Sequence, residues 1–148
     1  MRINQKTLVL VADGQRATFL RNEAQGETIS LEILHSMAFF NEANRDMQDD
    51  RSGHTKVGMS ERGTSYEQND RHQANEASFL QGVIGGIEAV MAEHDLNQIL
   101  LIAEPRALGI LREHMPSALM DKVTLQLDKD YTKNPLPELE RILRQREA

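Results

Sequence analysis

The chain contains no cysteine, so it forms no disulfide bond and offers no thiolate for catalysis or metal binding. Such a composition suits a reducing compartment. Its first apolar run, Leu8 to Ala12, is too short for the apolar region of a signal peptide or for a membrane span. We therefore expect a cytoplasmic protein without a membrane partner.

Positively charged residues are also scarce. The chain has 17 Lys and Arg and 23 Asp and Glu, so its net charge is −6. General binders of nucleic acid or of membrane surfaces are normally basic, so this balance argues against both classes while leaving room for a local basic patch. A chain of 148 residues with 39% hydrophobic residues is long enough for one domain with one core.

Common catalytic and metal-binding motifs are missing as well. The five histidines show neither HExxH nor HxxEH spacing, and no serine lies in a G-x-S-x-G turn. His72 and Glu76 are four residues apart, which favours a pair on a helix surface over a pair of metal ligands. The sequence predicts no metal site and no cofactor, and it favours a protein that is not an enzyme.

Two apolar runs without alternation, at 7–12 and 98–104, predict central strands that are covered on both faces. Asp13-Gly14 directly follows the first run and signals a hairpin, in which the glycine would supply a positive φ. Alternating segments predict three further strands, at 16–22, 29–37 and 123–130.

An apolar period of three and four residues predicts a helix from about Gln73 to His94. Gly82, Gly85 and Gly86 lie inside this period, so we interpret them as small residues that let the helix approach the sheet rather than as a phosphate loop. Shorter helices are predicted from Pro105 to Pro116, at 117–121 and from 136 onward.

The predicted order is βββ-loop-α-β-α-β-α. Right-handed crossovers between the later strands then give an α/β fold with a five-stranded mixed sheet of order 3-2-1-4-5, the ribonuclease-H-like pattern, flanked by helices. The whole chain, 1–148, forms a single domain with a long polar loop at about 41–74.

That polar segment has almost nothing to bury. Its tip combines four basic residues with one nearby acid, Glu61, so it is locally basic and could follow a phosphate backbone. A solvated excursion without function is the alternative, because long loops are commonly one or the other. The candidate RNA- or partner-binding residues are Arg51, His54, Lys56, Arg62, Arg71 and His72.

Four acids fall at or just past the ends of predicted strands, the edge where open α/β sheets place their sites. Together they could hold Mg²⁺ for phosphodiester hydrolysis. We favour turn and cap roles instead, because Asp is common in both. These residues are Asp13, Glu104, Asp128 and Asp130.

The segments "LVLVADGQRATFL", "DRSGHT…RGTSYEQNDRHQANEASF", "LIAEPRALGILREHM" and "VTLQLDKDYTKNPLPELERIL" together resemble the bacterial host attachment protein family over nearly the whole chain. That family is similar to the middle domain of archaeal and eukaryotic peptide-chain release factors. The resemblance implies the same sheet, with the polar segment standing where the release factor holds its catalytic Gly-Gly-Gln loop. This chain contains no Gly-Gly-Gln, and its one Gly-Gln, Gly14-Gln15, lies in the first hairpin.

Three hypotheses for function follow. The first is a non-enzymatic module that associates with RNA or the ribosome. The second is a protein-interaction factor, able to form homo-oligomers, that is needed indirectly for host-cell attachment. The third is a metal-dependent phosphodiester hydrolase at the sheet edge. We rank them in that order.

Overall fold

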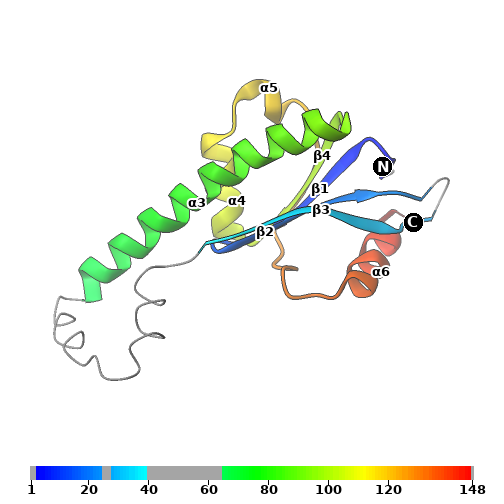
Figure 1. Cartoon of the computed structure of the whole chain (residues 1–148). Coiled ribbons are helices and arrows are strands. Elements are labelled where there is room, and N and C mark those ends of the chain that lie inside the picture. Colours follow the sequence, from blue (N-terminus) through cyan, green and yellow to red (C-terminus); the bar gives the residue numbers. More distant parts are fainter. Residues whose placement is uncertain (1–2, 25–27, 40–64, 148) are drawn as a thin grey trace, which may run out of the picture.

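The computed structural model describes residues 3–24, 28–39 and 65–147, with the backbone alone for 65–73 and 147. The elements follow the predicted order, with three strands before the long helix and two after it (Figure 1). They are β1 (Thr7–Ala12), β2 (Arg16–Asn22), β3 (Leu31–Ala38), α3 (Ser65–His94), β4 (Gln98–Ala103), α4 (Pro105–His114), α5 (Ser117–Met120), β5 (Val123–Leu127) and α6 (Leu136–Glu147).

The five strands form one mixed sheet in the order β3-β2-β1-β4-β5, which confirms the predicted α/β fold. β1 pairs antiparallel with β2 and parallel with β4, with Leu10 opposite Leu101 in the register. All six residues of β1 are buried, as are the last five of β4. The continuous apolar runs therefore mark the centre of the sheet, because these strands are covered on both faces.

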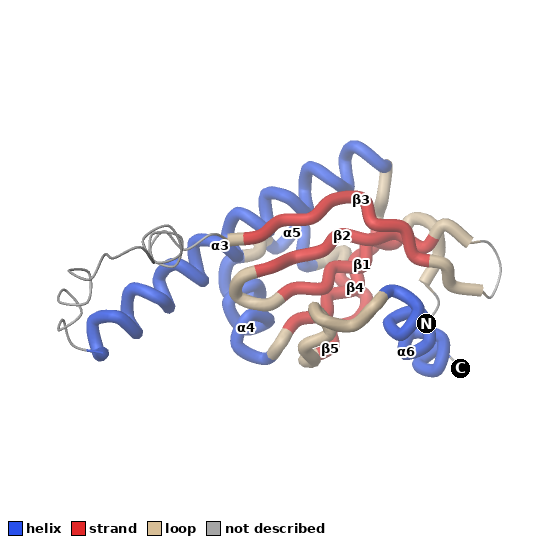
Figure 2. Tube along the Cα trace, turned by 60° about the horizontal axis from the view of Figure 1, so that its bottom comes forward, coloured by secondary structure: helices blue, strands red, loops and turns tan. Residues whose placement is uncertain are grey.

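Helices cover the two faces unequally. α3, α4 and α5 pack on one face around Leu10, Phe19 and Leu101. α6 lies on the other side of the sheet, where Leu139 and Leu143 join the second cluster (Figure 2). Two apolar layers thus enclose the sheet, and its carboxyl edge lies between them.

α3 begins at Ser65, earlier than the expected start near Gln73. At about 1.5 Å per residue, its 30 residues span about 45 Å, whereas the six residues of β1 span about 20 Å. The first turns of α3 consequently stand beyond the sheet (Figure 1). Apolar periodicity could not reveal these turns, because it records only the part of a helix that packs on a core. Of the expected 41–74 loop, 65–73 is helical and 40–64 lies outside the described residues.

Two strand ends also differ from expectation. β3 begins at Leu31 rather than Ile29, and the Leu31 N–H donates to Glu140 Oε2 of α6 at 2.8 Å. β5 ends at Leu127, three residues before Asp130, whose carboxylate instead accepts hydrogen bonds from Thr132. In both cases a side-chain hydrogen bond forms beside the strand end.

Only one of the three glycines in α3 is required by close packing. A Cβ on Gly86 would lie 2.9 Å from the Phe19 ring and 3.1 Å from the Met37 sulfur. Gly82 meets only an ordinary contact and Gly85 meets none. The expected close approach of helix and sheet is therefore confirmed at Gly86 alone.

Candidate functional site

The carboxyl ends of β1, β4 and β5 meet at one edge of the sheet, where the sequence places its acidic residues. Asp13 follows β1 and organises the hairpin to β2, because its Oδ1 accepts hydrogen bonds from the N–H groups of Gln15 and Arg16, both at 2.8 Å. Its Oδ2 accepts a hydrogen bond from the Thr132 hydroxyl at 3.1 Å. Both carboxylate oxygens of Asp13 are therefore engaged within the protein.

Glu104 follows β4 and caps α4. Its Oε1 accepts a hydrogen bond from the Ala107 N–H at 2.8 Å, and Pro105 occupies the first turn of the helix. One of the orphan N–H groups at the helix start is satisfied in this way. Glu104, which the sequence places only at the approach to Pro105, thus has a structural role as the cap of α4.

Thr132 brings two of the four acids together. Its hydroxyl lies 2.7 Å from Asp130 Oδ1 and 3.1 Å from Asp13 Oδ2, so a single O–H proton joins the loop after β5 to the first hairpin. Asp128 is exposed and lines a separate pocket beside α6. Within the described ranges, no three acidic or histidine side chains are arranged to hold a metal ion.

Glu76 is a residue of this edge that the sequence does not predict. Only 15% of its side chain is exposed, and its Oε1 lies 3.5 Å from Arg106 Nη2 at the start of α4. Glu76 points toward the hairpin and α4. Its expected pairing with His72 on the helix surface stays a prediction, because the His72 side chain lies outside the described residues.

The lack of a side chain at Gly14 leaves space for the Glu76 carboxylate beside the hairpin. A Cβ on Gly14 would fall 2.7 Å from the Glu76 carboxyl carbon. The backbone at Gly14 is not in the left-handed region, so the predicted need for positive φ is wrong. Glycine at this position leaves room for the Glu76 side chain, the far end of which would have to move if a Cβ were present.

The predicted basic residues are placed only in part. Arg51, His54, Lys56 and Arg62 lie outside the described residues. Arg71 and His72 belong to the first turns of α3, of which the backbone is described. The segment that contains the other four connects β3 to the end of α3 that stands beyond the sheet (Figure 1).

The fold and this edge define an α/β domain with a five-stranded mixed sheet, whose strand-end acids hydrogen-bond to a hairpin, a helix start and a loop. Residues 6–143 match the family model described as bacterial archaeo-eukaryotic release factor family 12, and the chain belongs to that family. Among curated proteins no match is found. In the part of the chain that is described, no helix is long and apolar enough to cross a bilayer.

Proposed function

We propose that this chain is a non-enzymatic module of translation that binds RNA on the ribosome through the segment between β3 and α3. Membership of a release-factor family is the observation that carries the proposal. It supports a translation-related module at the level of the family. The finer role, RNA binding without catalysis, rests on the residues of this chain.

The position of the segment supports the binding role. It leaves the sheet after β3 and rejoins the fold at Ser65, the end of a 30-residue helix that stands beyond the sheet. Arg51, His54, Lys56 and Arg62 fall in this segment in a chain whose net charge is −6. A locally basic segment gives an otherwise acidic chain the side chains with which to bind a phosphate backbone.

Two features support a role without catalysis. The sequence contains no Gly-Gly-Gln, and its Gly14-Gln15 belongs to the hairpin that Asp13 and Glu76 hold. Asp13 and Glu104 use their oxygens for the turn and the helix cap. Three of the four candidate metal ligands, Asp13, Glu104 and Asp130, therefore already have structural partners.

Co-sedimentation with ribosomes tests the proposal. Replacing Arg51, Lys56 and Arg62 together by alanine should release the protein into the supernatant and reduce the salt dependence of RNA binding, by roughly one unit of log–log slope for each phosphate group that is no longer bound. A matched control replaces the exposed cations Lys122, Lys133 and Arg141, which changes the net charge equally. A loop variant that co-sediments as well as the control does would refute the proposal.

A second candidate, an interaction factor acting indirectly in attachment, is favoured by the edge strand β3. β3 ends the sheet, and Ile33 on it is 50% exposed. Exposed apolar edge strands pair readily with another chain, including a second copy. Size-exclusion chromatography of the native protein and of Ile33→Lys tests this candidate, because a monomer that the substitution leaves unchanged would exclude self-pairing through β3.

A further inference from the structure

A polar pocket lies at the carboxyl end of β5, beside α6. Its volume is about 370 Å³, within the range of about 300–1,000 Å³ that is typical of small-molecule sites. The loop after β5 forms one wall and α6 forms another. The charged and aromatic residues that line it are Asp128, Lys129, Tyr131 and Arg146. The other lining residues have amide or aliphatic side chains and are Gln126, Leu127, Ile142 and Gln145.

Among the described residues, the cations of this pocket have no acidic partner. Lys129 and Arg146 are exposed, and neither forms an ion pair or a hydrogen bond with any described side chain. The side-chain oxygen of Gln126 accepts a hydrogen bond from Arg112 Nε, which fixes the amide and leaves its NH₂ group as a donor. The Lys129 ammonium, the Arg146 guanidinium and the Gln126 NH₂ group therefore line one pocket, and none of these donors has an acceptor among the described residues.

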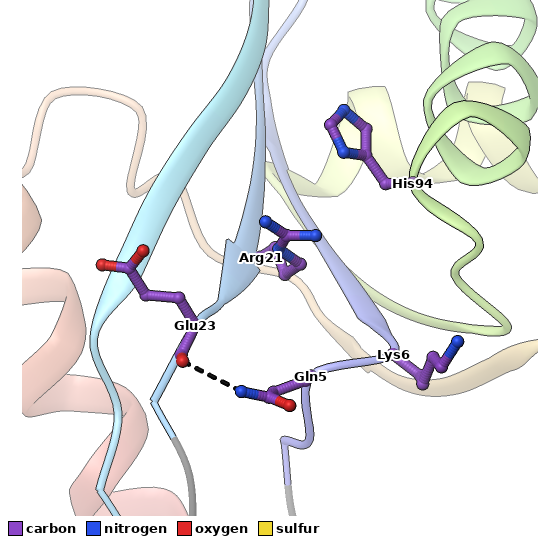
Figure 3. Close-up of a pocket in the computed structure, with 5 residues that line it drawn as sticks. All are labelled: Gln5, Lys6, Arg21, Glu23 and His94. Carbon is purple, nitrogen blue, oxygen red and sulfur yellow. Dashed lines mark hydrogen bonds between the residues drawn. The ribbon is translucent and has the colours of Figure 1, made fainter.

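A pocket at the opposite end of β1 provides a contrast, because its cations are already paired. It has a volume of about 320 Å³ and is lined by Gln5, Lys6, Arg21, Glu23 and His94 (Figure 3). Lys6 Nζ is 2.7 Å from Asp95 Oδ2, and Arg21 Nη2 is 2.7 Å from Glu32 Oε1. The hydrogen bond from Lys6 and its charge lower the pKa of Asp95, so that partner stays ionised. An anion entering this pocket would have to compete with existing carboxylates.

An aromatic ring stands beside the unpaired cations. Tyr131 is half-buried, packs against the apolar cluster on the α6 side and also lines the pocket. Aromatic side chains next to Arg and Lys are the combination that holds a base by stacking and its phosphate by charge-assisted hydrogen bonds. The pocket also follows the last parallel strand, at the carboxyl edge where open α/β sheets bind ligands.

We propose that this pocket binds a nucleotide, with its base against Tyr131 and its phosphate between Lys129 and Arg146. Asp128, the one acid in the lining, accepts hydrogen bonds from the ribose hydroxyls, and the Gln126 NH₂ group donates to the base or the phosphate. The same chemistry is presented by a free mononucleotide and by the phosphorylated end of an RNA strand. The inference does not depend on the segment between β3 and α3.

Calorimetric titration of the full chain with AMP and UMP tests the proposal, with adenosine, uridine and inorganic phosphate as partial ligands. Both nucleotides should bind, and each partial ligand should bind at least about tenfold more weakly, because it lacks either the base that stacks or the charged phosphate. In the Arg51, Lys56 and Arg62 variant, in which the proposed ribosomal site is removed, a 5′-phosphorylated RNA oligonucleotide that binds more tightly than AMP assigns the site to RNA ends. The reverse order assigns it to free nucleotides.

Substitutions locate the binding. Lys129→Ala with Arg146→Ala should weaken AMP binding by roughly tenfold or more, since the phosphate then has no charged donors. The control Lys122→Ala with Arg141→Ala removes two exposed cations outside the pocket and should leave binding unchanged. Tyr131→Phe should keep the affinity within about twofold, whereas Tyr131→Leu should lower it about tenfold.

The Tyr131 ring also reports binding directly. The chain has only two tyrosines, so Tyr66→Phe identifies the Tyr131 signals in a proton NMR spectrum, and these should move upfield with AMP. The proposal is overturned if wild type binds neither nucleotide, if the pocket double variant binds as the control does, or if inorganic phosphate binds as tightly as AMP. Nucleotide binding that survives in the Arg51, Lys56 and Arg62 variant would separate this site from the proposed ribosomal one.

Discussion

The two halves of the sheet's carboxyl edge use charged side chains differently. At the hairpin half, Asp13, Glu76 and Glu104 all contact the protein itself, through backbone N–H groups or Arg106. At the β5–α6 half, Lys129 and Arg146 have no such partners among the described residues. An acid at the end of a strand is therefore weak evidence for a site until the partners of its oxygens are known.

The largest effect on the free energy of unfolding should come from the central strands of the sheet, which both halves of the edge share. Leu101→Ala removes a fully buried side chain at the centre of β4 and should lower the free energy of unfolding by about 2–5 kcal/mol, measured by urea denaturation. Leu101→Met conserves volume and should cost less than about 1.5 kcal/mol. A loss below about 1 kcal/mol for the alanine variant would contradict central burial.

The second prediction concerns the contact between Gly14 and Glu76. Gly14→Ala places a methyl group 2.7 Å from the Glu76 carboxyl carbon, so the flexible Glu76 side chain must move, and the variant should lose about 1–2 kcal/mol, the lower part of the range for overpacking. In a Glu76→Ala background the same change should cost almost nothing, because the clashing atoms are gone. Four unfolding curves, for wild type, both single variants and the double variant, measure this coupling. Additive losses would show that Glu76 does not press on the hairpin.

The third prediction concerns Asp13. Asp13→Ala leaves the N–H groups of Gln15 and Arg16 without their acceptor and should cost about 0.5–2 kcal/mol, as the loss of a capping side chain does. Asp13→Asn keeps an oxygen acceptor and should cost less. Thermal denaturation of the three proteins makes the comparison. Equal melting temperatures for wild type and Asp13→Ala would show that the hairpin does not need this carboxylate.

The sequence predicts the sheet well, because strands buried on both faces have a local signature. The runs at 7–12 and 98–104 place β1 and β4 in the centre, and the alternating strands then take their order from the crossovers. The extra turns of α3 have no such signature, because they extend past the sheet. The sheet order could thus be predicted while the helix start could not.

The site is less predictable, because its contacts join residues that are distant in the chain. Glu76 meets Gly14 and Arg106, and Thr132 joins Asp13 to Asp130. No spacing rule links these positions, and the D-G motif suggested a backbone reason for Gly14 where the actual reason is a side chain from α3. The cap role of Glu104 could have been predicted, because a cap is a contact within a few residues.

The smallest effect on the free energy of unfolding should come from the β5–α6 half of the edge. Lys129→Ala with Arg146→Ala should change the free energy of unfolding by no more than about 0.5 kcal/mol, the usual range for exposed side chains without special contacts. The control pair Lys122→Ala with Arg141→Ala makes the same change in net charge, so any general charge effect appears in both variants. Urea denaturation without nucleotide provides the measurement. A loss above about 1 kcal/mol in the pocket variant alone would mean that these cations stabilise the fold as Asp13 does, and the difference between the two halves would disappear.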